Sequence, residues 1–159
     1  MFVHLRLHTE FSVVDGTTRV DEVAQLAAAD GQPALAIADF NNLFATVKFF
    51  RACRGVGVKP LIGAEVLVEG FAADASLNSR MVLLVQNAQG YLNLSELLAR
   101  GYTQNTGKSQ VLLRKAWLQE LNAGLICLCG AQAGPVGQAL MQGDPARQRD
   151  AALPRAPGV

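Results

Sequence analysis

The sequence predicts an α/β fold in which parallel strands alternate with helices. Short apolar runs of strand length recur along the chain, and segments with apolar residues at helical spacing lie between them. This alternation is typical of a parallel sheet with right-handed crossover connections. The pattern leaves open whether the sheet is doubly wound or a barrel. No glycine-rich phosphate-binding motif follows the first strand, which disfavours a nucleotide-binding fold.

Residues 2–8 are predicted to form the first strand. With a period of two, His4, Arg6 and His8 share one face, while the opposite face is apolar. Both histidines of the chain therefore lie on one strand, with a guanidinium between them. Ser12, which follows, is expected to cap a turn.

Two helices flank a buried strand in the next part of the chain. Residues 20–30 carry an apolar stripe and end at Gly31, a residue type that tolerates positive φ. The run 34–38 is apolar without alternation, as in a strand covered on both faces, and Asp39 closes it. A second helix is expected over 43–54. The first stripe comprises Val20, Val23, Ala24 and Ala27, and the second helix is expected to bury Leu43, Val47, Phe50 and Cys53.

The remaining elements continue the alternation. Residues 59–68 are predicted as the third strand, with Gly63 at a bulge or bend, and residues 80–86 as the fourth. A strand over 124–129 and a short helix over 135–141 come last. Between the fourth and fifth strands, a helix over 87–102 is expected to bury Tyr91, Leu94, Leu97, Leu98 and Tyr102.

The composition describes one domain, or a large piece of one. Of the 159 residues, 50% are hydrophobic and 17% are charged, so the chain has ample apolar material for a core. Its 14 basic and 13 acidic residues give a net charge of +1 with no basic block, which argues against nucleic-acid binding by electrostatics alone. No apolar run reaches membrane-spanning length, so we expect no membrane partner.

The three cysteines, Cys53, Cys127 and Cys129, lack the spacing of a disulfide framework. This usage suits a reducing compartment, and we expect a cytoplasmic protein. Cys127 and Cys129 share one face of an apolar strand. Two buried core thiols are favoured there over a metal pair, because free cysteine is so often buried.

Residues 144–159 differ from the rest of the chain. They hold three of the six prolines with a surplus of Ala and Arg, and they show no apolar periodicity. We therefore divide the chain into a folded part, 1–143, and a disordered tail, 144–159. The tail is either an ordinary disordered terminus or a premature end produced by a frameshift or truncation.

Polar residues gather at the expected strand ends. In parallel α/β folds the carboxyl ends of strands carry the functional groups, which here are His8, Asp39 and Glu65. An imidazole and two carboxylates from separate strands are typical of a zinc or manganese site. Arg6 cannot coordinate a metal and would repel a divalent cation, but it can pair with Asp39 or Glu65. We therefore favour a metal-free, salt-bridged site.

The run 4–16 (HLRLHTEFSVVDG) resembles the opening of the PHP (polymerase and histidinol phosphatase) domain, in particular that of the bacterial replicative DNA polymerase III alpha subunits. Four later blocks agree with that family in order and spacing. The resemblance covers about residues 2–143 and implies a distorted (β/α)₇ barrel, of which about the first half is present. The blocks are 33–50 (PALAIADFNNLFATVKFF), 57–65 (GVKPLIGAE), 83–102 (LLVQNAQGYLNLSELLARGY) and 117–130 (WLQELNAGLICLCG).

The resemblance also implies which metal ligands are kept and which are lost. Active PHP domains bind metal through a His-x-His on the first strand, an Asp-His after the second and a Glu on the third. At these positions the chain keeps His8, Asp39 and Glu65. Arginine or phenylalanine stands at three further ligand positions. The degenerate, non-catalytic metal site is thus expected to comprise Arg6, His8, Asp39, Phe40, Glu65 and Arg80.

A role in DNA replication follows from the resemblance. Alpha subunits with such degenerate PHP domains are thought to rely on a separate proofreading exonuclease subunit, which docks on this region within the polymerase III holoenzyme. DNA-directed DNA synthesis in this family, with its magnesium ions and its contacts to DNA, belongs to domains beyond this chain. We therefore expect a scaffold with no catalytic residue and no cofactor of its own.

Two alternatives stay open. In the first, the chain is a stand-alone metal-dependent PHP phosphoesterase, in which zinc or manganese on His8, Asp39 and Glu65 would activate a hydroxide toward a phosphate ester. In the second, it is a non-functional truncated remnant, because a half barrel leaves open sheet edges and exposed apolar helix faces.

Overall fold

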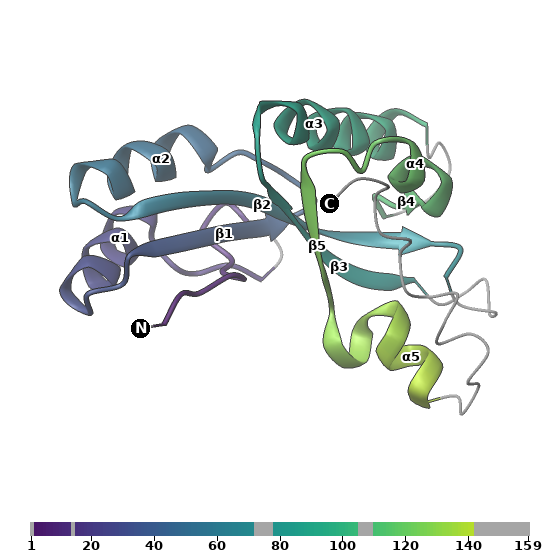
Figure 1. Cartoon of the computed structure of the whole chain (residues 1–159), viewed down its shortest axis with the longest axis horizontal. Helices are drawn as coiled ribbons and strands as arrows, with labels where there is room; N and C mark the ends of the chain where they lie inside the picture. Colours follow the sequence, from purple (N-terminus) through teal and green to yellow (C-terminus); the bar gives the residue numbers. More distant parts are fainter. Residues whose placement is uncertain (1, 14, 72–77, 105–109, 142–159) are drawn as a thin grey trace.

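The computed structural model describes residues 2–13, 15–71, 78–104 and 110–141. Their backbone forms a five-stranded sheet with α1 to α4 against one face and α5 on the other side (Figure 1). The predicted tail, and with it the division at residue 143, lies outside the described residues. In chain order the elements are α1 (Val20–Ala29), β1 (Ala34–Phe40), α2 (Thr46–Gly55), β2 (Lys59–Glu69), β3 (Ser79–Val85), α3 (Ala88–Thr103), β4 (Leu113–Arg114), α4 (Lys115–Glu120), β5 (Leu125–Cys129), a 3₁₀ turn (Ala131–Ala133) and α5 (Pro135–Met141).

The sheet is mixed rather than all-parallel. Its strand order is β1-β2-β3-β5, with β4 beside β2, and over the described residues this path does not close into a barrel. β1 and β2 are parallel, as predicted, but β3 runs antiparallel to both β2 and β5. The prediction of uniformly parallel strands was therefore wrong. Residues 70–78 are too few for a helical crossover, which needs a dozen or more residues, so the chain returns antiparallel.

The predicted first strand is not a regular strand. Residues 2–8 lie beside β1, where the amide of Ala36 donates to the His4 carbonyl at 2.9 Å and that of Ala38 to the Leu7 carbonyl at 2.8 Å. The two acceptors are three residues apart whereas the donors are two apart. One extra residue between His4 and Leu7 therefore interrupts the ladder, so this segment is not a regular strand.

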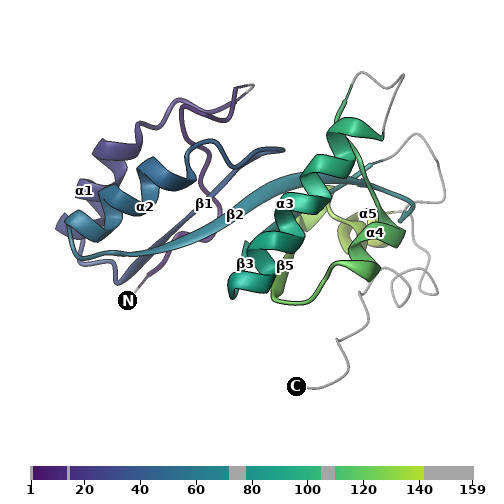
Figure 2. The same cartoon turned by 90° about the horizontal axis from the view of Figure 1, so that it is seen from above.

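The helices divide the core in two (Figure 2). α1 and α2 pack over β1, whereas α3 and α4 pack over β2 and β3. The α1 stripe is confirmed, and Gly31 has a φ of +67° at its end, as expected. In α3 the leucines are buried as predicted, but Tyr91 and Tyr102 are 43% and 57% exposed.

The predicted inner face of α2 was confirmed for Cys53 but wrong for Val47 and Phe50. Val47 and Phe50 are 65% and 50% exposed, whereas Phe49 and Cys53 are fully buried. Successive helical residues turn by about 100°. With Phe49 and Cys53 facing the sheet, Val47 and Phe50 must point outward.

No bulge interrupts β2 at Gly63. The ladder continues through this residue on both sides, where it pairs with Ala38 of β1 and Leu84 of β3. A Cβ atom at Gly63 would lie 2.5 Å from the Leu83 carbonyl oxygen. Glycine is therefore required by the close approach of the neighbouring strand.

Two short elements, β4 and α4, were not predicted, and Trp117 of α4 is buried in the core. Among the described helices, none has the length and apolarity to cross a bilayer.

Side chains alternate along β2, so Glu65 lies on the face opposite Ala64 and Val66, which pack under α3. The polar cluster described next thus lies on the sheet face away from α1 to α4.

Candidate functional site

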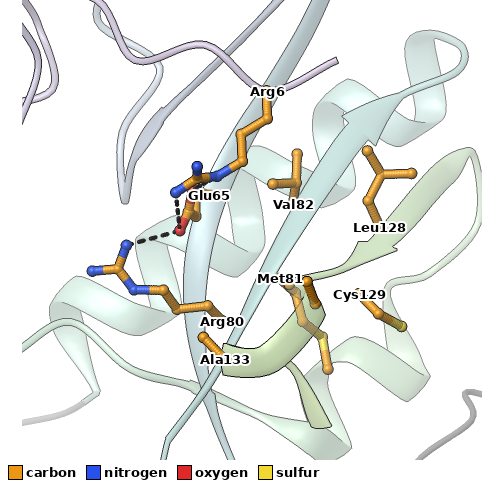
Figure 3. A pocket seen from close by; sticks show the side chains of 10 residues that line it. Arg6, Glu65, Arg80, Met81, Val82, Leu128, Cys129 and Ala133 are labelled. Atoms are coloured by element: carbon orange, nitrogen blue, oxygen red, sulfur yellow. Dashed lines mark hydrogen bonds and ion pairs between the residues drawn. The ribbon is translucent and has the colours of Figure 1, made fainter. Parts of the chain in front are cut away.

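Glu65 is the centre of an ion-pair cluster. Its side chain is only 2% exposed, and burying an unpaired carboxylate would cost several kcal/mol. Arg6 Nε lies 2.5 Å from Glu65 Oε2, and a second guanidinium nitrogen lies 3.2 Å from Oε1. His8 Nε2 is 2.8 Å from Oε2, and an Arg80 terminal nitrogen is 3.0 Å from Oε1. Both guanidinium groups converge on the carboxylate in Figure 3.

These contacts keep Glu65 ionised. Burial by itself raises the pKa of Glu65, but the hydrogen bonds from Arg6 and His8 outweigh it and hold the pKa below its ordinary value. In return, the hydrogen bond to Glu65 raises the pKa of Arg6 despite some burial. The cluster therefore contains an ionised carboxylate, that of Glu65, and charged guanidinium groups.

His8 bridges two carboxylates. Its Nε2 faces Glu65 and its Nδ1 lies 2.8 Å from Asp15 Oδ1. The imidazole ring is therefore held between two carboxylates, one on β2 and one in the loop after residue 8. Burial favours a higher pKa at Asp15, but hydrogen bonds from Ser12 and His8 lower it below its usual range.

Two contacts of the cluster were not predicted from the sequence: that of Asp15 with His8 and that of Ser12 with Asp15. Ser12 Oγ donates to Asp15 Oδ1 at 2.8 Å and accepts the Phe40 amide at 3.1 Å, so it fastens its loop to the end of β1. The turn-capping role expected of Ser12 is confirmed. The available signal was that Asp15 lies in the same short polar run as His8.

Asp39 does not contact Glu65 or its partners but binds Thr9. It is 1% exposed, and its two oxygens accept from Thr9, one from the backbone amide at 2.6 Å and one from the hydroxyl at 2.8 Å. Of the predicted site residues, the structure brings Arg6, His8 and Arg80 onto Glu65, while Asp39 anchors the neighbouring backbone. Phe40, the remaining member, lies 5.0 Å from the Arg80 guanidinium and forms a cation–π contact with it.

The donor set does not fit a zinc or manganese ion. His8 has both nitrogens engaged and Asp39 has both oxygens engaged, while two guanidinium groups flank Glu65. A divalent cation there would be repelled by both arginines. Within the described residues, no group of three or more His, Cys, Asp or Glu side chains is arranged to hold a metal.

The cysteine pair on β5 is only partly in the core. Cys127 is half-buried with its sulfur 3.7 Å from that of Met81, whereas Cys129 is exposed, so the expectation of two buried thiols was wrong for Cys129. Burial and the neighbouring Cys129 raise the pKa of Cys127 to about 12.

A cleft of about 550 Å³ opens beside the cluster. One end is charged, with Arg6, Glu65 and Arg80, and the other is apolar, with Val82 and Leu128 among its lining residues (Figure 3). The cleft places the exposed edges of both guanidinium groups beside an apolar wall.

Comparisons with known proteins agree with the resemblance seen in the sequence. A family model for the PHP domain matches residues 4–155. The chain is 42% identical over 146 residues to the DNA polymerase III subunit alpha of Pseudomonas aeruginosa, and 41% identical over 145 residues to that of Escherichia coli K12. These alignments cover 92% and 91% of this chain but 12% of each relative, at its N-terminus.

Among solved structures, an amidohydrolase from Chromobacterium violaceum with bound sulfate and no metal aligns with a TM-score of 0.46 and 21% identity. The alignment covers 68% of this chain and 40% of that one. The chain belongs to the PHP domain family, and it is homologous to the N-terminal PHP region of DNA polymerase III alpha subunits. It spans about 12% of the length of the curated relatives it matches.

Proposed function

We propose that this chain is the N-terminal PHP segment of a replicative DNA polymerase III alpha subunit and acts there as a non-catalytic scaffold in the cytoplasm. The support is the identity of about 42% to alpha subunits over nearly the whole chain. DNA synthesis, with its magnesium ions and its contacts to DNA, falls to domains outside the 12% that the chain spans.

The observation that carries the proposal is the set of cations on Glu65. Arg6 and Arg80 supply fixed positive charge to a buried carboxylate, at positions where the resemblance implies metal ligands. A guanidinium is always charged and is part of the chain, so the fold around Glu65 needs no bound ion. A phosphoesterase would instead require His8, Asp39 and Glu65 to leave their present partners.

The partner that we propose for this scaffold is the proofreading exonuclease subunit of the polymerase III holoenzyme. A PHP segment without catalytic metal keeps a folded surface, and the homology to alpha subunits supports a role for that surface in the holoenzyme. The proposal assigns the PHP segment a positioning role between two enzymes.

The test is binding of the exonuclease subunit to the full-length alpha subunit, with and without EDTA. We expect chelation to change the dissociation constant by less than about two-fold, because no bound metal supports the surface. A change of that size corresponds to less than about 1 kcal/mol of binding free energy. A loss of binding with EDTA that manganese or zinc restores would overturn the scaffold proposal.

A further inference from the structure

Helix α2 has two apolar faces. Its inner face packs Phe49 and Cys53 against the sheet, and both are fully buried. Its outer face carries Val47 and Phe50, which follow Phe44 of the preceding turn at steps of three residues; Phe44 is 68% exposed. Residues three or four apart lie side by side on a helix. We call this set, Phe44, Val47 and Phe50, the outer stripe.

The outer stripe is unusual for a surface helix. An amphipathic helix presents polar residues to solvent, and a helix that is apolar all round is normally covered on every side. Single exposed apolar residues are common, but a contiguous row with two phenylalanines is typical of a contact surface. In Figures 1 and 2, α2 lies on the outside of the molecule, and α1 is the neighbouring helix.

Helix α2 itself carries only positive charge beside the outer stripe. α2 contains no acidic residue, and Arg51 and Arg54 lie four residues beyond Val47 and Phe50, respectively, on the same side. Lys48, by contrast, is paired with Glu10 and Asp21. Neither arginine has a side-chain ion pair or hydrogen bond within residues 2–13, 15–71, 78–104 and 110–141.

We propose that the outer stripe with Arg51 and Arg54 is the docking surface for a partner protein that presents an acidic segment with apolar side chains. The apolar residues would supply the buried centre of the contact, and the two arginines would pair with carboxylates at its rim. A nucleic-acid backbone would match the arginines but would leave the exposed phenylalanines and valine without an apolar partner. The surface is on the sheet face opposite the Glu65 cluster, so it can be altered without disturbing that cluster.

This assignment rests on the proposed function, which supplies the partner for the test. The full-length alpha subunit and the proofreading exonuclease subunit are titrated by calorimetry, with Phe44→Ser/Phe50→Ser and Arg51→Glu/Arg54→Glu as the two test variants. The matched apolar control is Tyr91→Ser/Leu92→Ser on α3, where both side chains are also exposed. Arg19→Glu, at an exposed cation before α1, is the charge control.

Each test variant should weaken binding by about ten-fold or more, as expected for aromatic and arginine anchors, while the controls stay within about two-fold. Unchanged binding of the test variants, beside normal binding by wild type, would overturn the docking surface and leave the scaffold proposal standing. Failure of wild type to bind would instead overturn the proposed partner.

A labelling experiment separates a partner from the rest of a longer chain. In full-length Val47→Cys, the new thiol should react with a maleimide in the free subunit and become protected when the exonuclease binds. Site-resolved mass spectrometry distinguishes it from the native cysteines. Protection already present in the free subunit would show that the polypeptide covers its own outer stripe, which would overturn the assignment.

Discussion

Arg6 and Glu65 lie 59 positions apart in the sequence and form a two-point ion pair, with Nε 2.5 Å from Oε2 and a second nitrogen 3.2 Å from Oε1. Glu65 is buried on a sheet strand, whereas Arg6 is 56% exposed on the segment beside β1. The pair therefore attaches the N-terminal segment to the middle of the sheet. The ion pair offsets the free-energy cost of burying the Glu65 carboxylate and holds the N-terminal segment in place.

Replacing Arg6 with Ala should lower the free energy of unfolding by about 1–2 kcal/mol, because Glu65 keeps His8 and Arg80 but loses its two-point partner. Arg6→Lys should recover only part of this, since an ammonium lacks the planar fork. Urea denaturation followed by the fluorescence of Trp117, the one tryptophan, measures the change. Arg19→Ala, which removes an exposed cation 4.0 Å from Glu22, should change stability by less than about 0.5 kcal/mol.

Acid should destabilise the cluster. The pKa values of Glu65 and Asp15 are lowered in the folded chain, so the folded state binds fewer protons than the unfolded state in acid. Their contribution is complete above the ordinary pKa values of 4.5 for Glu and 3.8 for Asp, and it is lost as the pH falls through the lower pKa values of the folded chain. Urea midpoints measured from neutral pH downward should show this loss.

In Glu65→Gln the acid-dependent loss should shrink, because the variant has no carboxyl to protonate at the centre of the cluster. The variant should also be less stable than wild type at neutral pH, where the Arg6 and Arg80 guanidinium groups would face each other without a carboxylate between them. An acid profile in Glu65→Gln that parallels wild type would show that other carboxylates dominate the pH dependence.

Gly63→Ala should be strongly destabilising. A Cβ there would lie 2.5 Å from the Leu83 carbonyl oxygen, so β2 and β3 would have to separate, at a cost of about 1–3 kcal/mol. Gly55→Ala is the matched control because nothing lies within 4 Å of its Cβ position. If both variants melt at the same temperature, the close approach of the two strands is not as described.

Thiol reactivity should separate the three cysteines. Burial raises the pKa of Cys53 to about 11, and burial with the nearby Cys129 raises that of Cys127 to about 12, so few thiolates form there at neutral pH. Cys129 is exposed and should react first with a disulfide reagent. Cys129→Ser should remove the fast phase, whereas Cys53→Ser should leave it; a fast phase that survives Cys129→Ser would contradict the burial pattern on β5.

Hydrophobic periodicity predicted much of the fold, because the local pattern and the final packing agree in α1, β1 and the leucine face of α3. It failed where a helix carries apolar residues on two faces. In α2 the pattern alone does not say whether Val47 and Phe50 or Phe49 and Cys53 face the sheet. The predicted direction of β3 was also wrong. The order of strands and helices in the sequence does not say whether β3 follows a crossover or a short connection.

The site shows the same division. The grouping of Arg6 and His8 with Glu65 could be predicted from strand order, because residues at neighbouring strand ends meet at one edge. The diversion of Asp39 to Thr9 and the recruitment of Asp15 could not, since both depend on the path of the loop after residue 8. That path is determined by side-chain hydrogen bonds rather than by periodicity.

The central claim is that cations of the chain occupy the place of a metal on Glu65. Its most direct test is the metal content of the purified chain after equilibration with zinc and manganese and removal of free ions, measured together with the urea midpoint before and after EDTA. We expect substoichiometric metal, less than about 0.1 equivalent, and an unchanged midpoint, since a bound ion would stabilise the fold by mass action. Near-stoichiometric metal whose removal lowers the midpoint, and whose binding Asp39→Ala abolishes, would contradict the claim.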